Sequence, residues 1–210
     1  MSFGKNQSPR TNREYIRHLV CMGHESVLEH VSWTFLVTGA SRGFTHQLVR
    51  HRVGFSFSQL SQQYHDETEA QFVEPSAVAL SHKARRAWKR SISLSKKAYD
   101  EILKSLTDLK RSVDPEVDRR ELMREMRSAA RSVLPNATET KIVMTANARA
   151  LRYFLRIRGS IPGDEEMRRV AAALLKTVQR DAPSIFFDFQ IGKLGDGSPI
   201  VHWRGLEKQR

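Results

Sequence analysis

One segment constrains the fold of this chain more than any other, because residues 80–112 carry apolar side chains at helical spacing against a largely charged background. The apolar members of the pattern are Ala84, Trp88, Ile92, Tyr99, Ile102, Leu106 and Leu109. A single apolar stripe of this kind predicts a long amphipathic helix with one buried face. A second helix is predicted over about 115–133, and it ends before Pro135 because the residue preceding a proline avoids helical geometry. Residues 80–133 are therefore predicted to form a helical insert.

The rest of the chain mixes helical and strand patterns. Further helices are predicted over residues 11–23, 42–53, 147–157 and 163–180. Gly23 is expected to end the first helix, and Ser41 to cap the second, which would carry Gln47, Arg50 and His51. Strands are predicted at 31–38, where apolar and polar residues alternate, and at 140–145 and 185–191. The predicted fold class is α+β, an antiparallel sheet with packed helices and the long-helix insert, in a single domain over residues 1–210.

Composition bounds the class of protein. The chain has 210 residues, of which 40% are hydrophobic, as in an ordinary globular domain with a sizeable core. No apolar run approaches the roughly 20 residues needed to cross a bilayer, and the opening MSFGKNQSPRTNRE has no signal-peptide core, so a cytoplasmic protein is expected. The single cysteine, Cys21, has apolar neighbours, which favour a buried structural thiol over a redox centre.

The formal net charge of +12 admits the binding of a polyanion. However, the positive residues are scattered, and many of them lie on the predicted long helix. The sequence has no aromatic-rich RNA-recognition motif and no zinc knuckle, and its histidines and cysteine do not cluster at metal-ligand spacing. Attraction of anionic nucleotides and flavin phosphates accounts for the charge at least as well, so no nucleic acid, membrane or metal partner is expected.

The densest chemistry lies in residues 50–64, RHRVGFSFSQLSQQY. Arg50, His51 and Arg52 place two guanidiniums and an imidazole side by side, and hydroxyl and amide side chains follow. Arginine forks match phosphate oxygens two at a time, and amides can hydrogen-bond the edge of a planar heterocycle. The run therefore suits a nucleotide, although on chemistry alone a solvated basic loop explains it about equally well.

Residues 50–64 resemble the signature of the flavin-dependent thymidylate synthases, which is RHR, seven residues and Ser, followed two residues later by Arg-Tyr. Three further blocks resemble family segments in the same order: GHESVLEH at 23–30, RSVLP at 131–135, and the pair formed by NAR at 147–149 and Arg158. Together the four blocks span roughly residues 14–190. The chain is identified as a divergent member of this family.

The resemblance implies an activity and its cofactors. Family members transfer a methylene group from methylenetetrahydrofolate to C5 of dUMP, with FAD as the flavin and NADPH as the reductant. The protein must then hold planar rings face to face and polarise the uracil, while the cofactor supplies the difficult chemistry. The resemblance also implies a homotetramer whose active sites form where subunits meet.

The resemblance assigns roles to individual residues. The implied flavin contacts are Ser26, Arg50, His51, Arg52, Gln59, Asn147, Arg149 and Tyr153. The implied nucleotide contacts are Gln47, Arg50, Gln59, Leu60, Ser61, Gln62, Gln63, Arg131 and Arg158. Arg158 matches the arginine credited with stabilising negative charge on the uracil and is the first candidate for direct catalytic help. No metal site is implied.

Glu25, Glu29, His24 and His30 have open roles. The two glutamates could form an acid/base pair, but their i, i+4 spacing is more typical of an ordinary helix face. The histidines could be structural or could contact the cofactor.

Four departures from the family pattern concern the ligand sites. Eight residues rather than seven separate Arg52 from Ser61, Gln63 replaces an arginine, and Tyr153 replaces a histidine found in many members. GSIPGDEE at 159–166 also replaces the usual pattern after Arg158. These changes suggest a relaxed acceptor site that methylates UMP as well as dUMP. The alternative is a catalytically silent flavoprotein or a nucleic-acid-binding relative.

Overall fold

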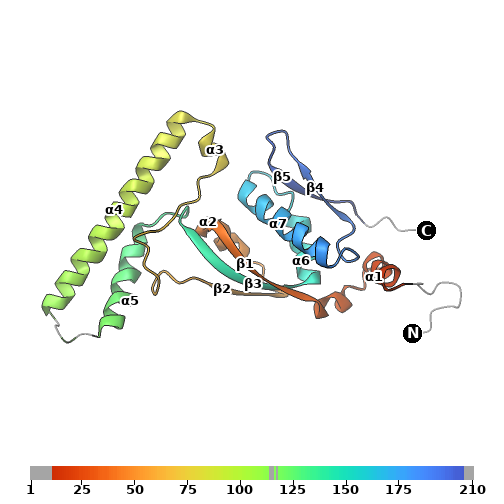
Figure 1. The fold of residues 1–210 in the computed structure, drawn as a ribbon, viewed down its shortest axis with the longest axis horizontal. Helices are drawn as coiled ribbons and strands as arrows, with labels where there is room; N and C mark the ends of the chain where they lie inside the picture. Colours follow the sequence, from red (N-terminus) through yellow and green to blue (C-terminus); the bar gives the residue numbers. More distant parts are fainter. Residues whose placement is uncertain (1–10, 114–115, 117, 206–210) are drawn as a thin grey trace. The chain divides into compact units, whose positions relative to one another are not determined.

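The computed structural model describes residues 11–113, 116 and 118–205, and it has the α+β architecture that the sequence predicts (Figure 1). The chain divides into two compact units. Unit 1 comprises residues 1–35, 51–56 and 144–210, and unit 2 comprises residues 36–50 and 57–143. The prediction of a single domain stays a prediction.

A three-stranded sheet has the order β1-β3-β2, with β1 at Ser32–Ser41, β2 at Phe55–Gln59 and β3 at Glu139–Asn147. Each unit contains part of each strand. In unit 1 the amide of Asn147 donates to the carbonyl of Gly54, and in unit 2 the amide of Leu60 donates to the carbonyl of Lys141. Because one partner number rises as the other falls, β2 and β3 are antiparallel. Residues of β3 alternate between buried and less buried positions, which places one face of the strand in the core.

Unit 1 contains α1 (Asn12–Cys21), the 3₁₀-helix η1 (Glu25–His30), α6 (Ala148–Arg158), α7 (Glu165–Asp181) and the antiparallel hairpin of β4 (Phe189–Lys193) and β5 (Pro199–Trp203). Leu151, Phe154 and Leu155 recur on one side of α6 and are fully buried. Met167, Ala171 and Leu175 do the same on α7. These two apolar faces supply much of the core of unit 1, because burial of aliphatic and aromatic surface is the main driving force of folding.

Unit 2 contains α2 (Arg42–Leu48), α3 (Ser76–Ala79), α4 (His82–Val113), α5 (Arg119–Ala130) and the short 3₁₀-helix η2 (Arg131–Val133). Helix α5 packs along α4, as Figure 1 shows. Tyr99 of α4 and Leu122 and Met126 of α5 are buried. The long helix and the helix after it are therefore confirmed, but of the seven apolar residues predicted for the buried face Tyr99 alone is fully buried, and Ala84 and Leu109 are exposed. The predicted start of the second helix at 115 lies outside the described residues.

Several local predictions are confirmed. Gly23 follows the end of α1 at φ 72°, a conformation that glycine adopts without a Cβ clash. Ser41 caps α2 by accepting a hydrogen bond from the amide of Phe44. The apolar residues of the N-terminal strand alternate as predicted.

Other local predictions are wrong. Helix α2 ends at Leu48 rather than at 53, so Arg50 and His51 lie beyond it, while Gln47 remains helical. The supposed loop at 50–64 contains β2, where Phe55 and Phe57 alternate with serines and the backbone pairs with β3. The last predicted strand begins at Phe189 rather than at Ile185, and the sequence reasoning missed β5. Cys21 is half-buried rather than buried. None of the helices described in this structure has the length and apolar character needed to cross a membrane.

Candidate functional site

The arginine-histidine-arginine run lies between α2 and β2, where Arg50 and Arg52 are exposed and His51 is buried. Arg158, at the end of α6, donates a hydrogen bond from Nε to Nε2 of His51 at 3.1 Å. The ring of His51 also packs edge-on against Phe154, with 5.1 Å between ring centroids. Burial lowers the pKa of His51, and the positive charge of Arg158 lowers it further. Since a guanidinium can only donate, His51 accepts this bond as a neutral imidazole.

The start of α6 is fixed by main-chain and side-chain bonds within unit 1. Asn147 caps the helix through Oδ1, which accepts from the amide of Ala150 at 2.9 Å. The Asn147 amide donates to the carbonyl of Gly54, which has a φ of 73°. A Cβ on Gly54 would lie only 2.7 Å from Cβ of Ala150, so this position requires glycine. Gly54 therefore brings the chain after the RHR run close to the start of α6.

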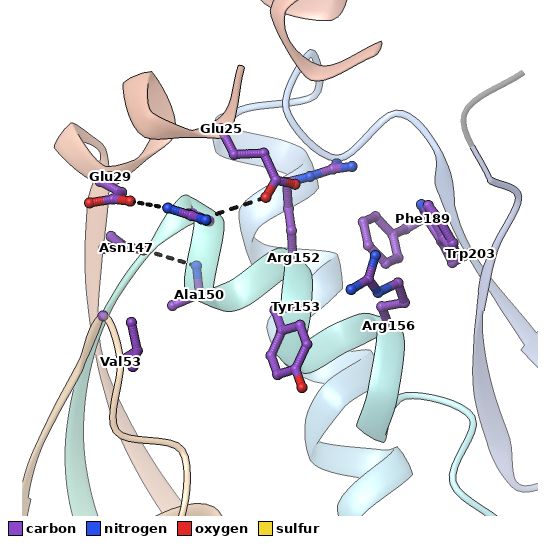
Figure 2. Close-up of a pocket in the computed structure, with 12 residues that line it drawn as sticks. Glu25, Glu29, Val53, Asn147, Ala150, Arg152, Tyr153, Arg156, Phe189 and Trp203 are labelled. Carbon is purple, nitrogen blue, oxygen red and sulfur yellow. Dashed lines mark hydrogen bonds and ion pairs between the residues drawn. The ribbon is translucent and has the colours of Figure 1, made fainter. Parts of the chain in front are cut away.

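A cavity of about 500 Å³ in unit 1 opens beside this helix start (Figure 2). Three of the predicted flavin contacts line it: Asn147, Arg149 and Tyr153. The guanidinium of Arg149 binds Glu29 at 2.5 Å and Glu25 at 3.6 Å, so both glutamates hold this arginine at the cavity. The i, i+4 glutamates lie on η1 and contact a predicted site residue, rather than only forming a helix face. Ser26, His51 and Arg52 belong to the same unit but do not line the cavity.

A buried ion pair supports the opposite wall of the cavity. Arg152 of α6 binds Asp188 through two hydrogen bonds of 2.6 and 2.7 Å, and both side chains are almost completely buried. The indole N–H of Trp203 donates to the same carboxylate at 2.7 Å. Sequence reasoning missed this triad, because its members lie on α6, before β4 and on β5, and no local motif links them.

The predicted nucleotide contacts at 59–63 lie in unit 2. Gln59, Leu60 and Ser61 line a cavity of about 470 Å³, and Gln63 lines a separate one of about 900 Å³. The amide group of Gln59 donates to Thr45 at 3.1 Å and to Thr140 at 3.4 Å. Gln63 donates to the hydroxyl of Ser128 on α5 at 3.2 Å. These side chains are therefore held in place by neighbouring elements before any ligand arrives.

Arg42, at the start of α2, is a candidate that the sequence reasoning missed. One of its terminal nitrogens donates to the carbonyl of Leu60 at 2.9 Å, while its buried Nε has no hydrogen-bond partner among the residues that the structure describes. Burial lowers the pKa of Arg42; Glu67 opposes this shift and the neighbouring charge of Arg131 adds to it. Two guanidiniums close enough to repel each other suit an anion. The sequence could not predict this contact, because Arg42 and Leu60 are 18 positions apart and no local motif links them.

A buried carboxyl lies near the predicted nucleotide contacts at 59–63. Glu67 is 4% exposed, and its backbone amide donates to the hydroxyl of Tyr99 on α4 at 3.2 Å. Burial raises the pKa of Glu67, against the opposing positive charges of His65 and Arg42. Gln62, which is also buried, lies beside this carboxyl. The structure thus brings Leu60, Gln62, Arg42 and Arg131 into one polar cluster, whereas Gln47 is exposed on α2.

The hydrogen-bond donors of these sites suit organic anions as ligands. Within residues 11–113, 116 and 118–205, no group of three or more His, Cys, Asp or Glu side chains could hold a metal ion. Exposed arginines, a neutral buried imidazole and amide-rich strand ends instead suit phosphorylated planar ligands. The fold and the side chains define an α+β protein with sites suited to nucleotide-like molecules.

Comparison with known proteins agrees with this class. A family model described as "Thymidylate synthase complementing protein" matches residues 1–184. Proteins called flavin-dependent thymidylate synthase from Mycobacteroides abscessus, Mycolicibacterium gilvum and Mycobacterium bovis are 46%, 42% and 41% identical over 196 residues. Each alignment covers 93% of this chain and 77% of the relative. The chain belongs to the flavin-dependent thymidylate synthase family.

Proposed function

We propose that this protein is a flavin-dependent methyltransferase that acts on C5 of dUMP, with methylenetetrahydrofolate as the one-carbon donor and NADPH as the reductant. Family membership supports the reaction class. A UMP-accepting site, a homotetramer and a cytoplasmic location remain predictions.

The observation that carries this proposal is the hydrogen bond from Arg158 to His51. It joins the RHR run to the end of α6 within unit 1, across 107 positions of sequence. A guanidinium held by a neutral imidazole keeps its full positive charge, and its other nitrogens remain available to a ligand. A cation held in this way can stabilise negative charge that develops on a uracil during methyl transfer, without reorganising first.

The residues present fit a flavin. Arg50 and Arg52 are exposed, with no side-chain hydrogen bond or ion pair among the described residues, so both can bind phosphate. Asn147, Arg149 and Tyr153 line a cavity with the aromatic, amide and cationic groups that a planar ring system requires. A bound flavin would supply the hydride. The role of the protein is to bind it and to orient the nucleotide beside it.

The segment at 59–63 is the proposed nucleotide site. Gln59, Leu60 and Ser61 line a cavity. Gln59 is held by Thr45 and Thr140, and the Leu60 carbonyl accepts a hydrogen bond from Arg42. Amide and hydroxyl groups on a fixed strand end can hydrogen-bond a pyrimidine edge and a sugar phosphate. Arg42 and Arg131 supply positive charge beside this segment.

Parallel assays of dUMP and UMP test the proposal. Purified protein supplied with FAD, methylenetetrahydrofolate and NADPH is expected to convert dUMP to thymidylate, and the inserted residue and Gln63 predict some turnover of UMP. If the protein binds FAD but methylates neither nucleotide, the alternative of a catalytically silent flavoprotein is correct. Strict selectivity for dUMP would leave the methyltransferase assignment intact and reject only the relaxed acceptor site.

A further inference from the structure

The cavity of unit 1 contains one cation that the ion pairs do not neutralise. Arg149 is paired with Glu25 and Glu29, and Arg152 is paired with Asp188. Arg156 also lines the cavity, and no ion pair neutralises it among the residues that the structure describes. The guanidinium of Arg156 can therefore pair with the anionic group of a ligand.

Arg156 lies between two aromatic rings. Its guanidinium carbon is 5.5 Å from the ring centroid of Tyr153 and 5.1 Å from that of Trp203. Tyr153 is 52% exposed and Trp203 is 39% exposed, so both rings retain surface at the cavity. Figure 2 shows Arg156 beside Trp203 and Phe189, on the side of the cavity away from Glu29. Exposed aromatic rings and guanidinium planes are groups on which heteroaromatic rings stack, and these three side chains are called the aromatic wall below.

Contacts with the core hold the indole of Trp203 in place. The indole N–H of Trp203 donates to Asp188, which Arg152 holds from the core. Phe189 packs against the guanidinium of Arg152, 5.1 Å from its centroid. The buried ion pair therefore sets the orientation of the exposed indole. A ring that is oriented before a ligand arrives binds it with a smaller entropic cost.

We propose that Tyr153, Arg156 and Trp203 form a stacking subsite for a planar heteroaromatic ring that is linked to an anionic group. The proposal rests on the proposed function, which offers two sources of such a ring. One is the reduced folate, whose ring is linked to glutamate carboxylates, and the other is the adenine end of the flavin dinucleotide, which is linked to a pyrophosphate. In either case the ring stacks on the aromatic wall and the anion binds Arg156. Trp203 lies beyond residues 1–184, which the family model matches.

Equilibrium titrations of the purified full-length protein with FAD and, separately, with tetrahydrofolate on the flavin-loaded protein test the subsite. The variants are Arg156→Gln, which changes an exposed side chain, and Trp203→Leu, which removes the indole. Arg180→Gln is the matched control, because it removes an exposed arginine of the same unit that does not line the cavity. Thermal unfolding of each variant checks that the fold is retained.

Both cavity variants are expected to bind one of the two ligands with roughly tenfold lower affinity, the size of effect found when one stacking partner is lost. Weaker tetrahydrofolate binding with unchanged FAD binding identifies the folate ring, and the reverse result identifies the flavin dinucleotide. If a folded Arg156→Gln variant binds both ligands as tightly as the Arg180→Gln control does, the subsite is refuted and the proposed function survives. A wild-type protein that binds neither ligand overturns both.

Discussion

The two units present their proposed ligand contacts in different ways. In unit 1, the proposed contacts Arg52, Arg149 and Tyr153 are exposed. The buried ion pair of Arg152 and Asp188 supports the cavity wall from the core. In unit 2, Gln62 and Glu67, which lie in and near the proposed nucleotide contacts at 59–63, are buried. Mutations of the exposed contacts Arg52, Arg149 and Tyr153 should therefore change ligand binding with little change in stability. Mutations of the buried groups Gln62 and Glu67 should change both.

The largest expected effect tests the buried ion pair of Arg152 and Asp188 in unit 1. Asp188→Ala leaves the guanidinium of Arg152 buried without its carboxylate and removes the acceptor of Trp203. Loss of one partner of a buried pair costs about 3–5 kcal/mol in the free energy of unfolding. Urea unfolding measures this loss. Asp181→Ala, which breaks the exposed pair with Arg180, should cost under about 1 kcal/mol, and equal losses in the two variants would contradict the supporting role.

The next effect concerns catalysis rather than stability. Arg158→Ala removes the cation that is hydrogen-bonded to His51. One preorganised donor commonly contributes about 2.7–4 kcal/mol to transition-state stabilisation, so methyl transfer should fall by about a hundredfold or more. Rapid-mixing measurements should show that NADPH still reduces the flavin. A variant with normal turnover and only an altered nucleotide affinity would assign Arg158 to binding.

A pH dependence of stability should come from the buried carboxyl of unit 2. Burial raises the pKa of Glu67 above its ordinary value of 4.5, so the folded protein holds this proton to higher pH than the unfolded chain does. The contribution of Glu67 to stability is therefore fully present below that ordinary value and is lost as pH rises through the raised pKa. Thermal unfolding as a function of pH should show this decline in the wild type. The decline should be smaller in Glu67→Gln, and identical profiles would show that Glu67 does not titrate in this way.

The smallest effect concerns the residue that replaces the family arginine. Gln63→Arg restores a charge but breaks the hydrogen bond to Ser128. A charged hydrogen bond contributes about 1.5–3 kcal/mol and a neutral one about 1 kcal/mol, so the net gain in dUMP binding should be roughly fivefold. The affinity of the variant should also fall more steeply with salt. An unchanged affinity and salt dependence would mean that position 63 does not face the phosphate.

Patterns with a local physical cause could be predicted from the sequence. The apolar stripe of α4, the alternation in β1, the cap at Ser41 and the stop at Gly23 each depend on neighbouring residues. Helix α2 was predicted too long because the basic run after Leu48 does not oppose a helix locally. Strand β2 was missed because its serines suggested a loop, whereas pairing with β3 decides its conformation.

Candidate site residues could be proposed from the sequence only where a motif marks them. Asn147, Arg149 and Tyr153 line one cavity, and Gln59, Leu60 and Ser61 line another, but the sequence could not predict what holds them. The contacts of Arg158 with His51, of Arg42 with Leu60 and of Trp203 with Asp188 join residues that the fold alone brings together. Such contacts depend on tertiary packing and leave no periodic signal.

The most direct test of the proposed ligand contacts compares one arginine of each unit. Arg52→Ala in unit 1 and Arg131→Ala in unit 2 each remove one guanidinium, and equilibrium titration measures the binding of FAD and of dUMP to both variants. Loss of a charged hydrogen bond of about 1.5–3 kcal/mol should weaken FAD binding to the first variant, and dUMP binding to the second, by roughly ten- to a hundredfold. The other ligand should bind each variant as it binds the wild type. If both variants lose the same ligand, or if Arg52→Ala retains FAD in full, the assignment of Arg52 to the flavin and of Arg131 to the nucleotide is wrong.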